Sequence, residues 1–363
     1  MAYQIVKNVS IAGITTCVPK NIEENNMLPF FKEGEAEKVI ISTGIERRRI
    51  VDPGVTSGDL CCKAAEDLIN GLGWKKDEID CLIFVSQTQD YILPATSCVI
   101  HGKLGLSNSC CCFDISYGCS GWVYGLSAIS SMLSAGVMKK GLLLVGDTTS
   151  TFKSAKDKTA RPLFGDAGTA TAVVYDEKAE EMRFAFYVDG KKFDAIIVPD
   201  GGCRKPFSAS SLEEKEYEEG VIRTPLHSAM NGIDVFSFGI TKGHEVTKDI
   251  LDFAGKSVDD VDYFIFHQAN KLMNEIIRKK LKIPEEKVPY SMKDFGNVSC
   301  ATIPLTIDYR FKDVSELRGK EMVTTAFGVG LSWGSAIFRL NDIQYVKMLE
   351  YEVVASRRAM NYN

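Results

Sequence analysis

The chain has 363 residues, 45% of them hydrophobic and 25% charged, which is the composition of a folded protein with a large core and not of a disordered one. Its net charge of −5 and its pI near 5.6 provide no general basic surface for nucleic acid. Eleven cysteines, an odd number, follow an N-terminus without a signal-peptide pattern. We therefore expect a protein of the reducing cytoplasm.

The first half of the chain alternates strand-like and helix-like segments. An apolar, β-branched run that ends in polar residues and then passes into a helical pattern is typical of a buried strand that feeds a helix. This pattern predicts strands at 5–15, 79–87, 110–115 and 141–146, helices at 57–72, 95–104 and within 115–138, and a variable segment at about 20–38.

The stretch 115–138 carries no charge, and its length would suit a membrane span. It is rich in serine and glycine, however, and lies between two predicted strands. A helix that is neutral on all sides and rich in small residues is typical of the centre of a large fold, where it packs against a symmetry-related helix. We expect a buried central helix here and no membrane span.

The second half repeats the alternation. Its pattern predicts helices at 243–253, at 270–281 and from about residue 299, and strands at 261–266, 321–326 and 335–340. Between the halves, the segment 203–224 is polar and rich in glutamate, which indicates a solvated loop or helix face. No low-complexity linker separates the halves, so they should share one core.

The two halves are related in sequence. Residues 73–84 align with 255–266. The same offset of 182 residues aligns Phe113 with Phe295 and Gly146 with Gly328. Three registers with one shift indicate an internal duplication. Because strands and helices alternate in each copy, we predict an α/β fold in which two helix-covered sheets lie back to back around central helices.

The duplication also divides the chain. We place an N-terminal half at 1–182 and a C-terminal half at 183–340, followed by a C-terminal extension at 341–363 to which the sequence assigns no role. Functional residues of α/β units gather outside the carboxyl ends of their strands. Both halves should therefore contribute to one site.

Cys119 is the candidate nucleophile of the first half. It lies between a predicted strand and the uncharged helix, and Gly118 and Gly121 beside it allow a tight turn and close approach of a substrate. A thiol at a helix N-terminus feels the partial positive charge of unpaired amides, which lowers its pKa and favours the nucleophilic thiolate. The other cysteines, including Cys112 and Cys300, are expected to be small apolar packing residues.

His267 and Asn297 are the candidates of the second half. His267 directly follows a predicted strand. Asn297 alone would be interpreted as a cap or turn residue, but the duplication relates its turn to that of Cys119, which favours a functional role. The three side chains would supply a nucleophile and two hydrogen-bonding groups. The glycine-bordered turn 327–334 adds backbone N–H groups that could meet a developing oxyanion.

Four motifs in a fixed order carry a resemblance to a known family. They are Asp114-Ile115-x-x-x-Cys119-Ser120-Gly121, His267-Gln268-Ala269-Asn270, Gly296-Asn297-x-Ser299 and Gly328-x-Gly330-Leu331-Ser332-Trp333-Gly334. With them the chain resembles β-ketoacyl-acyl carrier protein synthase III, a thiolase-fold condensing enzyme. The matches extend from Ser42-Thr43-Gly44-Ile45 to about Leu340. The resemblance implies a thiolase-like fold with layers in the order αβαβα.

The resemblance implies a two-step acyltransferase reaction. Cys119 would accept an acyl group from a thioester; a malonyl thioester would then bind, lose CO2 and attack the acyl carbon, giving a β-ketoacyl thioester in fatty-acid initiation or a related specialised pathway. Neutral His267 and Asn297 would stabilise the enolate by hydrogen bonds. The N–H groups of Cys119 and Val329 would form the oxyanion hole, although valine replaces the family's usual small residue. No metal and no cofactor are required.

The resemblance also implies partners. The substrates would be acyl and malonyl thioesters of coenzyme A, of acyl carrier protein or of both, and the protein would be a homodimer in which Leu93 reaches into the acyl pocket of the second subunit. Where the family often has a Trp and an Arg that hold the adenine of coenzyme A, this chain has Lys38 and Ser42. Their lack of a stacking surface favours carrier-bound donors.

A basic stripe could dock the carrier. Leu272 replaces an Arg with which the family often contacts carrier protein, but Lys271, Arg278 and Lys282 lie at spacings that place them on one face of the predicted helix. Such a stripe suits an acidic carrier protein. A solvated helix face is the alternative interpretation.

Two other functions stay open at this point. An acyltransferase on the same fold could pass the acyl group from Cys119 to an alcohol or amine without decarboxylation, but it would not need an enolate pocket. A non-catalytic partner subunit could only shape a complex, but it would not need the Cys, His and Asn set. Acyl chain length, branching and the choice between housekeeping and specialised pathways cannot be deduced from the sequence.

Overall fold

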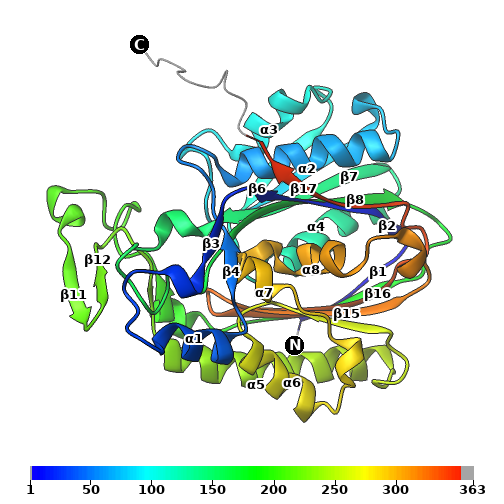
Figure 1. Ribbon diagram of the computed structural model, residues 1–363. Helices are drawn as coiled ribbons and strands as arrows, with labels where there is room; N and C mark the ends of the chain where they lie inside the picture. Colours follow the sequence, from blue (N-terminus) through cyan, green and yellow to red (C-terminus); the bar gives the residue numbers. More distant parts are fainter. Residues whose placement is uncertain (1, 353–363) are drawn as a thin grey trace.

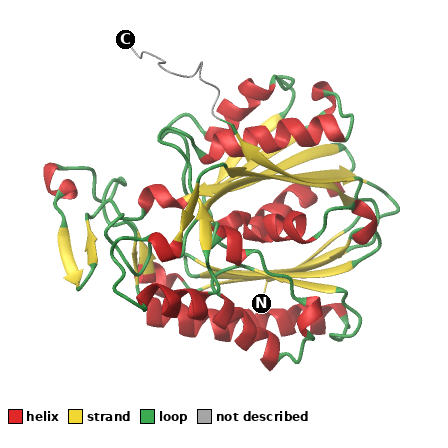
Figure 2. Ribbon diagram, in the orientation of Figure 1, coloured by secondary structure: helices red, strands yellow, loops and turns green. Residues whose placement is uncertain are grey.

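The computed structural model describes residues 2–352 and arranges them in five layers. Two large sheets enclose the central helices α4 (Gly121–Ser134) and α8 (Thr302–Arg310), and further helices cover the outer face of each sheet (Figure 1; Figure 2). The predicted αβαβα arrangement of two helix-covered sheets is therefore confirmed.

One sheet has six strands. In spatial order they are β17 (Tyr345–Tyr351), β2 (Val9–Pro19), β8 (Asp166–Tyr175), β7 (Lys140–Thr148), β5 (Cys81–Val85) and β6 (Cys111–Ile115). Helices α2 (Ser57–Gly71) and α3 (Thr96–Leu104) cover its outer face (Figure 1). The inner strands are almost entirely buried, as expected for a sheet with helices on both faces.

The other sheet has five strands. In spatial order they are β1 (Ala2–Val6), β9 (Met182–Val188), β16 (Ser332–Arg339), β15 (Glu321–Gly328) and β14 (Tyr263–Phe266). Helices α5 (Gly232–Ala254) and α6 (Lys271–Lys280) cover its outer face (Figure 1).

The internal duplication is visible in the strand pairings. β5 pairs in parallel with β7, which pairs antiparallel with β8, and β14, β15 and β16 repeat this arrangement. β14 begins at Tyr263, which is 182 residues after the start of β5 at Cys81. The duplication inferred from the sequence is therefore present in the fold.

The uncharged stretch forms the predicted central helix. Trp122, Leu126, Ile129 and Leu133 of α4 are completely buried in the apolar cluster between the two sheets. No helix within residues 2–352 is both long enough and apolar enough to cross a membrane.

The N-terminal run at 5–15, predicted as one strand, forms two. β1 ends at Val6, β2 begins at Val9, and Asn8 between them has a left-handed φ of 61°. β1 joins the five-stranded sheet and β2 the six-stranded one. The prediction was wrong because Lys7 and Asn8 interrupt the apolar run with a turn, and the pairing partner decides to which sheet each strand belongs.

Other elements were not predicted or begin earlier than predicted. β8 and β9 were not predicted, and α5 begins at Gly232 and not at residue 243, because the side chain of Asn231 caps it by accepting the N–H of Asp234 at 3.1 Å. β17 lies in the C-terminal extension and pairs in parallel with β2. Residues 353–363 of that extension lie outside the described residues.

The ends of the chain cross between the two sheets. β1 comes from the N-terminal half but extends the sheet of the C-terminal half, and β17 extends the sheet of the N-terminal half. The division of the chain into halves at residues 182 and 340 therefore stays a prediction made from the sequence.

The acidic segment 203–224 contains a small hairpin. Its strands are β11 (Lys215–Glu218) and β12 (Val221–Arg223), and it stands away from the layers (Figure 1). All four residues of β11 are exposed, in agreement with a solvated segment.

The remaining elements are short. The strands are β3 (Ile22–Glu24), β4 (Arg47–Arg49), β10 (Ile196–Ile197) and β13 (Ala229–Met230), and the helices are α1 (Glu35–Thr43) and α7 (Met292–Phe295). The 3₁₀ helices are η1 (Asn25–Met27), η2 (Lys76–Glu78), η3 (Thr149–Phe152), η4 (Gly190–Ala195), η5 (Ala209–Leu212), η6 (Glu285–Lys287), η7 (Ser299–Ala301) and η8 (Val314–Glu316).

Candidate active site

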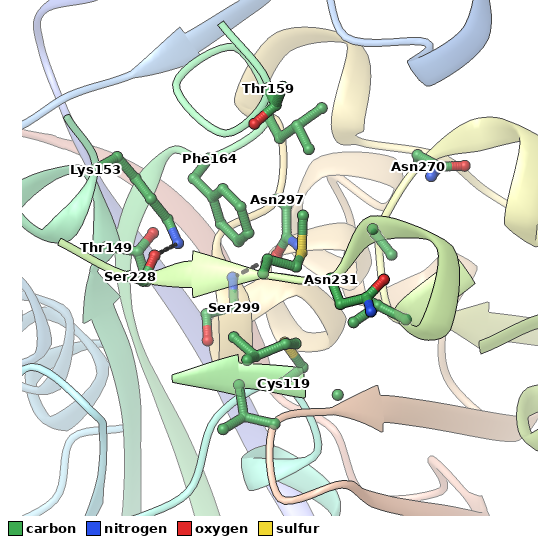
Figure 3. Close-up of a pocket in the computed structure, with 18 of the residues that line it drawn as sticks. Cys119, Thr149, Lys153, Thr159, Phe164, Ser228, Asn231, Asn270, Asn297 and Ser299 are labelled. Atoms are coloured by element: carbon green, nitrogen blue, oxygen red, sulfur yellow. Dashed lines mark hydrogen bonds between the residues drawn. The ribbon is translucent and has the colours of Figure 1, made fainter. Parts of the chain in front are cut away.

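The three predicted catalytic residues line one cavity. Cys119, His267 and Asn297 border a cavity of about 850 Å³, part of which is drawn in Figure 3. Cys119 follows β6, His267 follows β14 and Asn297 follows α7, while Val329 follows β15. The carboxyl ends of strands from both halves therefore meet at this cavity, as the duplication predicts.

Cys119 lies in a tight turn before α4. The N–H of Gly121, the first residue of the helix, donates to the carbonyl oxygen of Gly118 at 2.7 Å. Cys119 is 8% exposed, and burial raises the pKa of its thiol to about 11. The expectation of a lowered pKa was wrong because the loss of water around a thiolate, together with the nearby charge of Asp147, outweighs the hydrogen bonds that would stabilise it.

Three hydrogen-bond donors nevertheless face the sulfur. The hydroxyl of Ser299 and the backbone N–H groups of Val329 and of Cys119 itself all act to lower the pKa of the Cys119 thiol. Two of these donors are the amides expected to form an oxyanion hole. They therefore converge beside the atom to which an acyl group would be attached.

His267 is a neutral imidazole. It is 1% exposed, and burial lowers its pKa to about 3. Its Nδ1 lies 2.8 Å from the hydroxyl oxygen of Thr302, and its backbone N–H donates to the carbonyl oxygen of Thr325 at 2.8 Å. The ring is therefore held uncharged at the end of β14, and its Nε2 can donate a hydrogen bond to an enolate when Nδ1 accepts one.

Asn297 has its amide oxygen occupied. This oxygen accepts the N–H of Ser299 at 2.8 Å (Figure 3), while the backbone N–H of Asn297 donates to the carbonyl oxygen of Leu163 at 2.8 Å. Because the oxygen is engaged in the turn, the side-chain NH2 is the group available to donate. Asn297 therefore stabilises its own turn, as an asparagine after a glycine is expected to do, and also lines the cavity.

The glycine-bordered turn packs directly against the cysteine. A Cβ atom on Gly328 would lie 2.8 Å from Sγ of Cys119, closer than real Cβ atoms approach such a neighbour. The hydroxyl oxygens of Ser120 and Ser332 lie 2.7 Å apart and join the turns of the two halves. The absence of a side chain at Gly328 therefore allows the N–H of Val329 to reach the sulfur.

Three residues of the cavity region were not predicted as functional. Ser299 occurs in a quoted motif, but its hydroxyl contact with Cys119 and its left-handed φ of 52° depend on the folded turn. Thr302 contacts His267 and Lys153 lines the cavity, yet both lie outside the motif residues. No short sequence pattern marks them.

The residues predicted at the surface have mixed surroundings. Leu93 is 79% exposed, and Lys271 and Lys282 are exposed. Arg278, in contrast, forms two hydrogen bonds with Glu275, at 2.9 and 2.7 Å, and is largely buried. Arg278 therefore stabilises α6 and offers little free charge to a partner.

The described residues show no metal centre and no disulfide. Within residues 2–352, no group of three or more His, Cys, Asp or Glu is placed to hold a metal ion. All eleven cysteines lie in this range, and none of them forms a disulfide.

Two family models match the chain. The model described as 3-oxoacyl-[acyl-carrier-protein (ACP)] synthase III matches residues 113–190, and the model of the C-terminal part of the same synthase matches residues 251–340. These segments contain Cys119, His267, Asn297 and Val329.

Relatives extend the match to most of the chain. A β-ketoacyl-[acyl-carrier-protein] synthase III of Clostridium perfringens is 31% identical over 336 residues, which cover 92% of this chain and 100% of the relative. The synthase III of Caldanaerobacter subterraneus subsp. tengcongensis is 30% identical and covers 91% of this chain and 97% of its own. The chain belongs to the 3-oxoacyl-[acyl-carrier-protein] synthase III family.

Solved structures agree with this membership in the synthase III family. A 3-oxoacyl-(acyl-carrier protein) synthase from Burkholderia xenovorans has a TM-score of 0.90 and 37% identity, and the match covers 96% of this chain and 99% of that one. A synthase III from Pseudomonas aeruginosa has a TM-score of 0.79 and 27% identity, with 93% and 99% covered. The resemblance inferred from four motifs, and the condensing-enzyme function it implies, are thereby confirmed.

Proposed function

We propose that this synthase III joins an acyl thioester to a malonyl thioester with loss of CO2, and that the acyl group is carried on Cys119. The observation that carries this proposal is the meeting of Cys119, His267 and Asn297 in one buried cavity. A nucleophile beside two neutral hydrogen-bond donors is the set that acyl transfer followed by enolate formation requires.

In the first half-reaction the sulfur of Cys119 attacks the carbonyl carbon of the acyl thioester. The thiol loses its proton as it attacks, since its raised pKa keeps it neutral at rest, and this proton ends on the sulfur of the departing carrier. The tetrahedral oxyanion would accept hydrogen bonds from the N–H groups of Cys119 and Val329, both of which face the sulfur. Collapse of this intermediate breaks the donor's C–S bond, releases the thiol carrier and leaves the acyl group on Cys119.

In the second half-reaction a malonyl thioester loses CO2. The electron pair of the broken C–C bond forms an enolate whose oxygen would accept hydrogen bonds from Nε2 of His267 and from the side-chain NH2 of Asn297. Both groups are neutral donors that keep their geometry through the step. The enolate carbon then attacks the acyl carbon, and the Cys119 thiolate leaves as the β-ketoacyl thioester forms.

The two alternative functions have less support. Transfer of the acyl group to an alcohol or amine would not use the pair of neutral donors formed by His267 and Asn297. A silent partner subunit would not require a cavity of about 850 Å³ around a cysteine with two amides facing its sulfur. The condensation accounts for all of these features.

A homodimer would complete the acyl pocket. The loop before Pro94 exposes three apolar residues in a row, Tyr91, Ile92 and Leu93, of which Leu93 is 79% exposed. β6 is one of the two edge strands of the six-stranded sheet and is only partly buried. An open edge and an exposed apolar loop on the same half of the chain support pairing with a second copy.

Carrier-bound thioesters are the donors that we favour for at least one substrate. Lys38 and Ser42 are exposed on α1 and offer no planar surface for an adenine. Lys271 and Lys282 provide free charge on and beside α6, whereas Arg278 is paired with Glu275. The docking proposal therefore rests on the two lysines. Eleven cysteines without a disulfide among residues 2–352 support our further proposal that this protein acts in the cytoplasm.

Intact-protein mass spectrometry tests the proposed function. After incubation with a panel of acyl-coenzyme A and acyl-carrier thioesters, the wild type should retain one acyl group, and later addition of a malonyl thioester should discharge it as a β-ketoacyl product. Cys119→Ala should retain no acyl group, while Cys112→Ala, which removes a half-buried thiol from β6, should behave as the wild type. Acylation of Cys119→Ala, or release of the acyl group without CO2, would contradict the proposal.

A further inference from the structure

Lys153 brings a charge into the catalytic cavity. It follows η3 and lines the cavity together with Cys119, although it is only 9% exposed. Its ammonium group donates a hydrogen bond to the hydroxyl oxygen of Ser228 and lies 3.9 Å from the centre of the Phe164 ring (Figure 3). A buried ammonium group is costly unless a group of opposite charge approaches it.

No carboxylate among residues 2–352 forms an ion pair with Lys153. A Cys119 thiolate would favour the charged form of Lys153 most, but the raised pKa of Cys119, about 11, keeps that group a neutral thiol at rest. Asp157 favours the charged form less, and this carboxylate lies 3.6 Å from Arg223 and also accepts the N–H of Thr159 at 2.9 Å. Asp147 is likewise engaged, because it accepts a hydrogen bond from the hydroxyl of Ser86 at 2.9 Å. The cavity therefore contains a cationic side chain whose counter-ion is missing from the fold.

The position of Lys153 indicates which part of a substrate it meets. Ile233 and Val198, which are 81% and 37% exposed, mark the mouth of the cavity, whereas Lys153 is 9% exposed and lies in its buried part with Cys119, which is 8% exposed. Figure 3 shows Lys153 and Ser228 on one side and Asn231 and Asn270 on the other. A carrier arm must enter from the mouth to reach Cys119, so the acyl group that it delivers shares the buried part of the cavity with Lys153.

The malonyl carboxylate is a poor ligand for this ammonium group. Decarboxylation removes the negative charge of that carboxylate, so a cation bound to it would stabilise the ground state more than the transition state and slow the reaction. An acyl group that keeps its own carboxylate through the reaction has no such conflict. Its charge would gain a charge-assisted hydrogen bond in a region from which water is excluded.

We infer that the first substrate of this synthase is a half-thioester of a dicarboxylic acid, whose far carboxylate is bound by Lys153 with the help of Ser228. This inference rests on the proposed acylation of Cys119 and specifies the acyl class. Lys153 lies among apolar cavity residues. These are Phe152, Leu163, Phe164, Ile197 and Met230, and they would pack against the methylene chain between the thioester and the carboxylate.

Matched pairs of acyl donors test the inference. The rate of Cys119 acylation would be measured by intact mass for succinyl against butanoyl and for glutaryl against pentanoyl thioesters, each on coenzyme A and on acyl carrier protein. Wild type should load at least one carboxylated donor about tenfold faster or more than its methyl-terminated partner, because a site built around a buried donor rejects an analogue that leaves it unpaired. Lys153→Met, which keeps the chain length but removes the charge, should reverse the preference.

A second lysine serves as the control. Lys156, on the same loop, is exposed and paired with Glu214, so Lys156→Met should keep the wild-type ratio. Faster loading of the methyl-terminated donors by wild type, or an unchanged ratio in Lys153→Met, would overturn the inference. So would an equal slowing of all donors and of iodoacetamide alkylation in Lys153→Met, which would show that Lys153 acts on the thiol. Failure of every donor to load Cys119 would instead refute the proposed function.

Discussion

Nδ1 of His267 and the hydroxyl oxygen of Thr302 lie 2.8 Å apart at the start of α8. The same hydroxyl lies 3.1 Å from the carbonyl oxygen of Ser299, but it has only one proton to donate. If Nε2 of His267 is to donate to an enolate, Nδ1 must accept, and the Thr302 proton must point toward the ring. Thr302 would then be a positioning residue that fixes the tautomer of the catalytic imidazole.

Thr302→Val should slow malonyl decarboxylation and leave acylation of Cys119 unchanged. Valine keeps the shape of threonine but cannot donate to Nδ1, so the tautomer with Nε2–H loses its preference. We expect kcat of the decarboxylation half-reaction to fall between about threefold and tenfold, with KM unchanged. Thr302→Ser keeps the hydroxyl and should restore the rate. An equal loss in both half-reactions would indicate a general structural role for Thr302.

His267→Ala and Asn297→Ala should impair decarboxylation more than acylation. Both side chains are expected to donate to the enolate, and removal of one preorganised donor typically costs about 10² to 10³ in rate. The two half-reactions can be measured separately, by acyl mass on Cys119 and by release of CO2 from a malonyl thioester. Equal losses in the two assays would favour the acyltransferase alternative.

The stability of the fold should depend on His267 in acid. The pKa of His267 is about 3 in the folded protein and 6.5 when exposed, so between these values the unfolded chain binds the extra proton. This contribution makes stability fall as the pH is lowered through that window, by up to about 1.4 kcal/mol per pH unit, and leaves it constant above pH 6.5. His267→Gln cannot be protonated there. Denaturant unfolding of both proteins at pH 7 and pH 4.5 should therefore show a smaller loss for the variant.

Gly328→Ala should slow acylation of Cys119. The added Cβ would lie 2.7 Å from Cβ and 2.8 Å from Sγ of the cysteine, so the turn must move and take the N–H of Val329 with it. A small displacement of an oxyanion donor should reduce the acylation rate by at least about tenfold. Gly190→Ala is the matched control, because a Cβ there meets no atom within 4 Å. Wild-type acylation by Gly328→Ala would contradict the assigned oxyanion hole.

The carrier-docking proposal makes a prediction that depends on salt. Reversing Lys271 and Lys282 to Glu should raise KM for carrier-bound substrate and leave the kinetics with small thioesters unchanged. Turnover of carrier-bound substrate by wild type should fall as salt rises, because exposed charges are screened beyond about 10 Å at 0.1 M. The same reversal of Lys63 and Lys75, near α2 on the opposite outer layer, should have no effect. Unaltered carrier kinetics in the Lys271 and Lys282 variant would refute the docking surface.

Much of the fold and the central triad could be predicted from the sequence because both depend on local patterns. The constant offset of 182 residues revealed the duplication, and the glycines beside Cys119 and the polar residues after each buried strand marked the site. The strand at 5–15 failed because hydropathy does not record which sheet a strand joins: β1 and β2 are separated by a single turn yet lie in different sheets.

The sequence by itself determined which residues could perform the chemistry: a cysteine, a histidine and an asparagine in ordered motifs. Only the tertiary structure decided their environment. Burial, which depends on the whole fold, raised the pKa of Cys119 and lowered that of His267. Contacts between distant segments placed Thr302 on His267 and Ser228 on Lys153, 35 and 75 residues apart in the chain. Pairs so far apart leave no pattern in a single sequence, because their proximity results from the packing of segments that are distant along the chain.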